Sequence, residues 1–341
     1  MELYLDSADI KEIEEAFKLG FLAGLTTTPT FMHRHGITDV DGTIVRLSKI
    51  VPVLQIEALG DTSEQIVKEA HRLIGLGLDK GKTVFKTPVS LEGVRACRQM
   101  KDEGMRVNVH LVYTLQQAYM AMAAGADYVC PLVGRLQDEG HDALALIEQC
   151  VEAVGFYGYD TKIMFSSVRH PEHVRNAINI GVHTCTVPWK VMKQLTENSF
   201  TTVGIREFEI HTQLMTTRVK EIIREAKPAV RLKDTVFDAM VQMTDSRLGA
   251  VAVLDNSGRV TGIFTDGDLR RQLNRDPESF MDKKMSDFSY NPPLTVSGDE
   301  LLYQAVKIFK DRQVDNIIVL DNDEFIGMID VQDLIKQDLL S

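Results

Sequence analysis

The sequence of 341 residues contains little cysteine and no long apolar run. Its four cysteines show no CxxC or CxxH spacing, which excludes a disulfide framework or a zinc cluster and predicts reduced thiols, mostly in cores; they are Cys97, Cys130, Cys150 and Cys185. No apolar run approaches the roughly 20 residues that span a bilayer, and the first segment is acidic where a signal peptide is basic and then apolar. We therefore expect a cytoplasmic protein with no membrane segment and no bound metal.

Positive charge is also in deficit. The chain has 38 lysine and arginine residues against 49 aspartate and glutamate residues, a net charge of −11, which argues against nucleic acid as a partner. Hydrophobic residues make up 44% of the chain, enough to build cores and to exclude a disordered or fibrous protein. The length allows two domains.

Short apolar runs alternate with longer amphipathic stretches from residue 3 to about 188. The runs cover residues 3–6, 23–28, 53–58, 83–87, 107–112, 128–133, 162–167 and 183–188. Eight such runs with helical patterns between them predict βα units around a parallel sheet, and their number favours a closed (β/α)₈ barrel. Chemistry in such barrels lies at the carboxyl ends of the strands. The polar residues there are Asp6, Thr28, Glu57, Lys86, Asn108, His110, Arg135 and Ser167.

A second domain follows Pro228, which should end the preceding helical stretch. Residues 249–269 and 315–334 resemble each other, and an amphipathic stretch precedes each of them. Two such units bury their apolar faces by pairing. We therefore predict a first domain over 1–225 and an α+β tandem module over 229–341, with repeats at about 229–280 and 281–341.

Lys86 lies among apolar residues in VFKTP, at the end of the fourth run. In a water-poor barrel mouth its pKa should fall, which would free a neutral amine to form a Schiff base with a carbonyl. Asp6 and Glu57 end neighbouring runs and could move protons there. Two other interpretations stay open: Lys86 as an ion-pair partner at a strand end, and Asp6 as a helix cap.

Arg135, Ser167 and Arg169 follow the sixth and seventh runs. Two guanidinium groups and a hydroxyl at neighbouring strand ends make a phosphate clamp. The alternative is that these arginines are solvated surface residues without a ligand.

Several segments together resemble the small transaldolases and the related fructose-6-phosphate aldolases. The similarity runs from residue 1 to about 220 through LYLDSADI, GLTTTP, VFKTPVSLEGVRA, VNVHLVYTLQQA, GADYVCPLVGRLQDEGHDAL and SSVRHPEHV. The resemblance implies a TIM barrel that needs no cofactor for catalysis and acts on a sugar phosphate. It assigns Lys86 as the Schiff-base lysine, Asp6 as its acid/base and Glu57, with a bound water, as a proton shuttle. Glutamate at position 57, where the aldolase branch has glutamine, favours the transaldolase branch.

The same resemblance assigns the substrate contacts and shows three departures from the family. Asn108 would orient substrate hydroxyls, and the phosphate would be held by Arg135, Ser167 and Arg169. Thr28 replaces an asparagine that contacts the donor, His110 replaces a threonine that holds the catalytic water, and Leu132 replaces an aromatic residue. His110 is thus either an acid/base or a filler.

These departures leave three functions open. The first is transfer of a ketol unit by a transaldolase, and the second is cleavage without transfer by an aldolase. The third is a catalytically silent scaffold that binds a nucleotide.

The C-terminal repeats resemble a pair of cystathionine-β-synthase-type (CBS) domains, in VTGIFTDGDLRRQL most closely the pair of arabinose-5-phosphate isomerases. The resemblance implies an adenine nucleotide or nucleotide-sugar effector held by Gly262, Thr265 and Asp268. The second copy has Asp330 where the hydroxyl should be, and its charge would repel a phosphate. At most one of two clefts should then take a nucleotide. A purely architectural pair stays open, and both resemblances imply a homo-oligomer.

Overall fold

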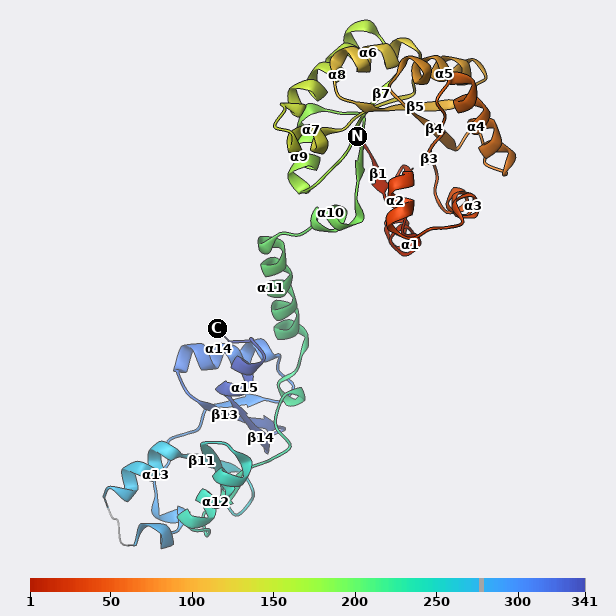
Figure 1. The fold of residues 1–341 in the computed structure, drawn as a ribbon. Helices are drawn as coiled ribbons and strands as arrows, with labels where there is room; N and C mark the ends of the chain where they lie inside the picture. The colour runs from red at the N-terminus through yellow and green to blue at the C-terminus, as the bar shows by residue number, and fades with distance from the viewer. Residues whose placement is uncertain (276–278, 341) are drawn as a thin grey trace. The chain divides into compact units, whose positions relative to one another are not determined.

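The computed structural model describes residues 1–275 and 279–340 (Figure 1). The chain forms two compact units, Met1–Glu197 and Asn198–Ser341. This division comes earlier in the chain than the predicted boundary between 225 and 229. The reason is packing: Leu214 and Val219 lie in one hydrophobic core with Phe309 of the second repeat.

The first unit is a closed barrel of eight parallel strands in chain order, which confirms the predicted fold class. Each predicted apolar run forms one strand. The strands are β1 (Glu2–Asp6), β2 (Gly24–Thr26), β3 (Leu54–Glu57), β4 (Thr83–Pro88), β5 (Arg106–Val112), β6 (Tyr128–Pro131), β7 (Lys162–Phe165) and β8 (Thr184–Val187).

Helices surround this ring of strands (Figure 1). They are α1 (Ile10–Phe17), α2 (Pro29–Arg34), α3 (Val40–Ile50), α4 (Ser63–Gly75), α5 (Leu91–Asp102), α6 (Leu115–Ala123), α7 (Val133–Asp138), α8 (Ala143–Tyr157), α9 (Pro171–Ile180) and α10 (Trp189–Gln194). Their apolar faces pack on the outer strand residues, such as Ile56, Phe85 and Val109, in one continuous core. The four cysteines are free and buried in this unit.

Strand register places the candidate residues side by side. Glu57 of β3 pairs with Lys86 of β4, Lys86 pairs with Asn108 of β5, and Pro88 pairs with His110. Because alternate residues of a strand point to the same side, Asn108 and His110 both face the barrel interior, two residues apart in depth. The register therefore brings a lysine, a carboxylate and an imidazole to the same end of the barrel.

The second unit contains two repeats of the same topology. Helix α11 (Ser199–Thr216) precedes them. The first repeat contains β9 (Ala229–Arg231), α12 (Val236–Ser246), β10 (Ala250–Leu254), β11 (Val260–Thr265) and α13 (Asp266–Leu273). The second contains β12 (Thr295–Ser297), α14 (Leu302–Arg312), β13 (Asn316–Asp321), β14 (Glu324–Asp330) and α15 (Val331–Lys336). In each three-stranded sheet the central strand has one parallel and one antiparallel neighbour.

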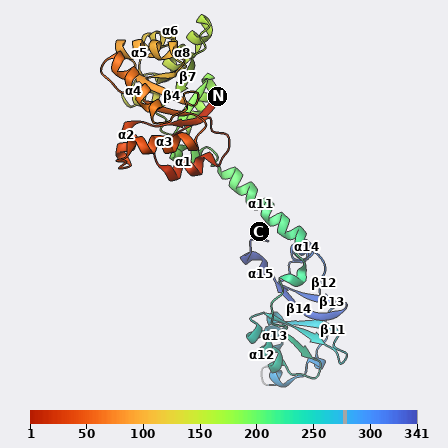
Figure 2. The ribbon, with the colours of Figure 1, turned by 90° about the vertical axis from the view of Figure 1, so that its right-hand side faces the viewer.

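The two sheets pack on each other, as Figure 2 shows for β11 beside β13 and β14. Their shared core contains Ala250 and Ala252 from the first repeat and Ile318 and Met328 from the second, so the predicted pairing of repeats is confirmed. A partly buried ion pair adds a polar link between them. Arg224 donates to both carboxylate oxygens of Asp333, at 2.8 and 2.7 Å, and also to the carbonyl oxygens of Ser246 and Arg247.

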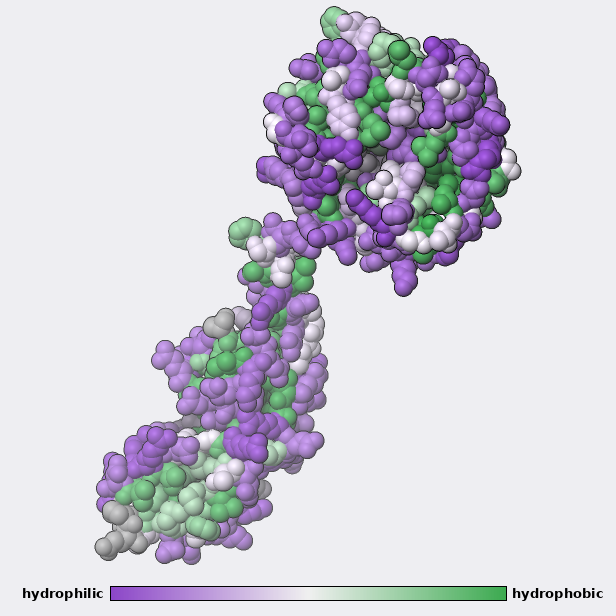
Figure 3. Space-filling view, in the orientation of Figure 1, coloured by the Kyte–Doolittle hydropathy of each residue, from purple (hydrophilic) through white to green (hydrophobic). Residues whose placement is uncertain are grey.

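Hydrophilic residues cover most of the visible surface of the barrel unit, with apolar patches between them (Figure 3). Within the described ranges, no helix is both long enough and apolar enough to cross a membrane. The same residues contain no cluster of histidine, cysteine, aspartate and glutamate side chains suited to a metal ion.

Candidate active site

A cavity of about 650 Å³ opens at the carboxyl ends of the barrel strands. Most of the residues singled out from the sequence line it: Asp6, Thr28, Glu57, Lys86, His110, Leu132, Arg135, Ser167 and Arg169. Asn108 is the exception. The fold thus gathers side chains from seven strands and the segments that follow them around one volume.

Lys86, Glu57 and His110 form a linked trio in this cavity. The Lys86 Nζ donates to Glu57 Oε1 at 2.8 Å and to the carbonyl oxygen of Thr27 at 3.3 Å. The second carboxylate oxygen of Glu57 lies 2.9 Å from His110 Nε2. Lys86 is only 4% exposed. Both oxygens of the glutamate are therefore engaged, one by the candidate nucleophile and one by the imidazole.

The protonation of Lys86 differs from the sequence-based expectation. Burial alone would lower its pKa, as predicted, but the charge and hydrogen bond of Glu57 outweigh burial, and the pKa is raised. The expectation of a lowered pKa was wrong because it took no account of a carboxylate within hydrogen-bonding distance. Lys86 rests as an ammonium ion and must lose a proton before it can attack a carbonyl.

The pKa values of Glu57 and His110 are both lowered. Burial would raise the pKa of Glu57, but the charge of Lys86 and the hydrogen bond with His110 lower it to about 2. Burial lowers the pKa of His110 more than the neighbouring carboxylate raises it, so the imidazole is neutral near pH 7. A neutral imidazole beside an ionised glutamate can accept and pass on a proton, because neither group must first lose one.

Asp6 is the carboxylate best placed to accept a proton. Burial raises its pKa, although a hydrogen bond from the Thr26 hydroxyl at 2.8 Å and the charge of Lys86 both favour the ionised form. The cap of helix α1 is Asp9, whose carboxylate accepts from the Lys11 backbone N–H at 2.8 Å. Asp6 is therefore not the cap of this helix, and its side chain remains directed to the cavity.

Asn108 lies below the cavity floor. It is fully buried, does not line the cavity, and donates to Gln55 Oε1 at 2.6 Å. The side-chain oxygen Oδ1 of Asn108 has no hydrogen-bond partner in the described part of the chain. Asn108 therefore lies beside Lys86 without lining the cavity, and its contact with substrate hydroxyls stays a prediction.

The residues of the predicted phosphate clamp lie together on the side of β6 and β7. Ser167 has a positive φ of 59°, and its carbonyl oxygen would lie 1.9 Å from a Cβ on Gly134, so only glycine permits this close approach. Arg135 and Arg169 flank this contact and both line the cavity. Arg169 pairs with Asp138 at 2.9 Å, and Arg135 donates to the Tyr113 hydroxyl at 3.0 Å. Both guanidinium groups retain unused donors for an oxyanion.

The departures at positions 28 and 132 also lie at the cavity. Thr28 caps helix α2, where its hydroxyl oxygen accepts from the Phe31 backbone N–H at 3.3 Å. Its hydroxyl proton is still available to a ligand. Leu132 lines the cavity with an aliphatic side chain, so position 132 offers no hydroxyl or ring.

Sequence reasoning missed Arg34, which also lines the cavity. It considered only polar residues that end apolar runs, whereas Arg34 is the last residue of α2, a full helix beyond β2. Cys130 was known only as a buried thiol, and the structure places it in the cavity wall, with its pKa raised by burial to about 11. The residues around Arg34, HRHG, give no periodic signal that one face of α2 lines the cavity at the open end of the barrel.

A second cavity, of about 930 Å³, lies between the two repeats of the C-terminal unit. Thr265, Asp268 and Asp330 all line it, so the two repeats contribute to one volume. Asp268 and Thr265 form a capping box on α13, in which the Asp268 carboxylate accepts from the Thr265 N–H and hydroxyl at 3.0 and 2.7 Å. Gly262 does not line the cavity. A Cβ there would lie 2.4 Å from the Tyr290 side chain, so this glycine serves packing.

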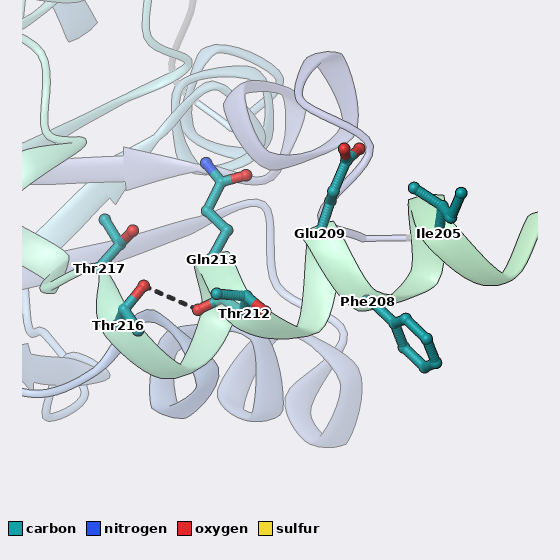
Figure 4. A pocket seen from close by; sticks show the side chains of 7 residues that line it. All are labelled: Ile205, Phe208, Glu209, Thr212, Gln213, Thr216 and Thr217. Carbon is teal, nitrogen blue, oxygen red and sulfur yellow. Dashed lines mark hydrogen bonds between the residues drawn. The ribbon is translucent and has the colours of Figure 1, made fainter. Parts of the chain in front are cut away.

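A third, shallower hollow belongs to α11 alone (Figure 4). Glu209 and Gln213 extend from one side of the helix and Phe208 from the other, and the Thr216 hydroxyl is satisfied by the Thr212 carbonyl oxygen at 2.8 Å. With a single ionisable side chain in its lining, this hollow offers no catalytic group pair.

Fold and site define the class: a (β/α)₈ barrel with a buried lysine at the carboxyl end of its strands, joined to a module of two paired repeats. The family model for Transaldolase/Fructose-6-phosphate aldolase matches residues 3–242, and the chain belongs to this family. The CBS domain model matches residues 214–275 and 285–339, so the chain carries a CBS pair.

Curated relatives agree with the first match. The chain is 37% identical over 213 residues to "Probable transaldolase 2" of Bacillus anthracis, an alignment that covers 61% of this chain and 96% of the relative. It is 38% identical over 210 residues to "Probable transaldolase" of Thermoanaerobacter sp., with coverage of 61% and 95%. These alignments span nearly the whole length of the relatives.

Two solved structures of CBS domain proteins align with part of the chain. The CBS domain of a membrane protein from Sphaerobacter thermophilus aligns with a TM-score of 0.36 and 18% identity, over 41% of this chain and 99% of that one. A CBS domain protein from Pyrobaculum aerophilum, solved in complex with AMP, aligns with a TM-score of 0.33 and 17% identity, over 36% and 98%.

Proposed function

We propose that the barrel is a transaldolase-like enzyme that forms a Schiff base between Lys86 and a ketose phosphate and transfers its ketol unit. The observation that carries the proposal is the buried Lys86, paired with Glu57 at 2.8 Å, in a cavity that Asp6, His110, Arg135 and Arg169 also line. A buried amine with proton-transfer groups around it is what imine chemistry requires. The family membership supports the same activity.

The reaction begins when the Lys86 ammonium loses a proton to Asp6, whose raised pKa makes it a better acceptor than an ordinary carboxylate. The amine adds to the ketose carbonyl, and the resulting carbinolamine loses water when the proton held by Asp6 is relayed through Glu57 and His110 to its hydroxyl group. This transfer leaves Asp6 ionised again. In the imine, Asp6 removes a proton from the hydroxyl two carbons beyond the imine carbon. The bond between the carbon next to the imine carbon and the carbon that carries this hydroxyl then breaks. This step releases an aldehyde and leaves an enamine on Lys86.

The phosphate clamp should act on substrate affinity. An Arg135→Gln variant should raise KM for a ketose phosphate by about tenfold or more, because it removes one charge-assisted contact made in ground and transition states alike. Steady-state kinetics with phosphorylated and unphosphorylated ketoses test this. An Arg175→Gln variant, whose residue pairs with Glu172 outside the cavity, is the control. Equal loss of kcat/KM on both substrates would show that Arg135 does not bind phosphate.

Aldol cleavage without transfer is the second candidate. Thr28, His110 and Leu132 all lie in the cavity and change the surroundings of the reacting carbons. A loosely held donor would leave the enamine to be protonated and released as a free ketone. Product analysis with and without an acceptor aldose phosphate separates the two activities.

We propose further that the cavity between the CBS repeats binds a nucleotide and that its occupancy regulates or assembles the enzyme. Thr265 and Asp268 stand at the start of α13, with Arg270 and Arg271 also in the lining, which offers contacts to a ribose and a phosphate. Asp330 and Asp315 line the same volume, so acidic groups limit how many phosphates it accepts.

An Asp268→Ala variant should lose the thermal stabilisation that millimolar adenine nucleotide gives the wild type. The substitution also removes a helix cap, which costs about 1 kcal/mol by itself. Asp238→Ala is a matched control, because Asp238 makes the same capping box with Thr235 on α12 and lies outside the cavity. If both variants respond to nucleotide as the wild type does, the ligand does not use Asp268.

A further inference from the structure

The arginine missed in the sequence has an unusual position in the barrel. Arg34 lines the catalytic cavity, yet within residues 1–197, all of which the structure describes, it is the one arginine without a hydrogen-bond or ion-pair partner. The others contact carboxylates, hydroxyls or carbonyl oxygens. A guanidinium held at a cavity wall with all five donors unused is a ready site for an anion.

Strand order fixes the side of the cavity on which Arg34 lies. In the closed barrel β2 and β6 are separated by three strands in either direction, so they lie opposite each other. Arg34 follows β2, whereas Arg135 follows β6 and Arg169 follows β7. Lys86 is on β4, midway between β2 and β6. The cavity therefore has a cation on each side of the lysine.

The acidic residues of the cavity do not neutralise Arg34. The lining contains two carboxylates, those of Glu57 and Asp6. Glu57 is already shared by Lys86 and His110, and Asp6 accepts from Thr26. Three arginines and Lys86 thus line the cavity with two carboxylates. Asp138 pairs with Arg169, and the positive charges of Arg34 and Arg135 have no carboxylate partner.

We propose that the substrate carries a second anionic group next to its carbonyl carbon, and that Arg34 binds it. This group is either a phosphate on the neighbouring carbon or a carboxylate formed by that carbon. The carbonyl carbon of a ketose has two substituents, and Lys86 attacks between them. When the longer arm extends to the clamp on β6 and β7, the shorter arm points to β2 and Arg34. The proposal deepens the proposed function and depends on it for the orientation of the ketose.

Thr28 is consistent with such a substrate. It lies on the same side as Arg34, at the start of α2, and offers a single hydroxyl proton because its oxygen accepts from Phe31. One donor suits an anionic oxygen whose charge is met by a nearby guanidinium.

Binding of open-chain sugars that cannot form an imine tests the anion site apart from catalysis. Three probes share a phosphate at C6: glucitol 6-phosphate has a hydroxymethyl group at C1, glucitol 1,6-bisphosphate has a second phosphate, and 6-phosphogluconate has a carboxylate. Calorimetry on the full chain should show that one or both of the probes with a second anionic group bind about tenfold tighter than glucitol 6-phosphate. The tighter of the two identifies the anion.

An Arg34→Gln variant should reduce this preference to within about twofold. The residue is exposed and has no partner, so the variant should unfold at the wild-type temperature. Arg46→Gln is the control, because Arg46 pairs with Glu14 outside the cavity and its loss should leave the preference intact. A wild type without preference, or a preference that survives Arg34→Gln, would overturn the proposal.

Trapping with borohydride separates this result from the proposed function. A preference that depends on Arg34 but no ketose adduct on Lys86 would retain the anion site and refute the Schiff-base enzyme. An adduct on Lys86 with no preference among the probes would do the reverse.

Discussion

A Lys86→Met variant should form no borohydride-stable adduct with any ketose phosphate, and its turnover should fall by at least about 10³-fold. The amine is the atom that forms the covalent bond in the proposed reaction, and no other lysine lines the cavity in the described residues. Methionine keeps the length of the buried stem without the charge. Mass spectrometry of the trapped wild-type enzyme should place the adduct on the peptide that contains residue 86.

The control for this experiment is Lys162→Met. Lys162 begins β7, at the other end of the barrel, and pairs with Glu2 at 2.8 Å. This variant should be trapped like the wild type. An adduct that persists in Lys86→Met, or one mapped to another residue in the wild type, would refute the assignment of Lys86. Thermal unfolding of Lys86→Met checks that the loss is chemical, since the change leaves the Glu57 carboxylate with His110 alone.

A Glu57→Gln variant should move the pH dependence of imine trapping to lower pH. Glu57 is what raises the pKa of Lys86, so without its charge the burial of Lys86 dominates and lowers that pKa. Below the pKa the neutral, reactive fraction of an amine rises tenfold for each pH unit. We expect the rising limb of the trapping rate to shift by about one to two pH units.

Turnover by the same variant should fall, although imine trapping becomes faster at low pH. Glutamine cannot relay protons to the carbinolamine, so kcat should fall by about 10²-fold even where trapping becomes faster. Glu2→Gln is the matched control, because Glu2 also pairs with a lysine but lies outside the cavity. If the rising limb in Glu57→Gln coincides with that of the wild type, Glu57 does not set the protonation of Lys86.

The barrel could be predicted because its signals are local. Buried parallel strands are continuous apolar runs, and each of the eight was readable at its own place in the chain. The candidate residues that end those runs, such as Glu57 and Lys86, could be identified for the same reason. Strand ends in a closed barrel converge whatever the side chains are, so nearly all of these candidates met around one cavity.

The errors and omissions arose from contacts between segments distant in the chain. The pKa of Lys86 depends on a carboxylate 29 residues away in sequence, at hydrogen-bonding distance in space. Gly262 fits the nucleotide-binding pattern, yet the structure places it against Tyr290. Asn108 and His110 follow the same pattern of alternation, but the depth of the barrel floor puts the first below the cavity and the second inside it.

The sequence by itself determined the closed barrel, the paired repeats and the position of the candidate lysine, because hydrophobic periodicity and strand ends are local properties of the chain. Tertiary structure decided which charges act on that lysine, where the units divide, and that Arg34 faces the cavity without a partner. Electrostatic energy depends on distance in space and on burial, and neither is written in the spacing of residues along the chain.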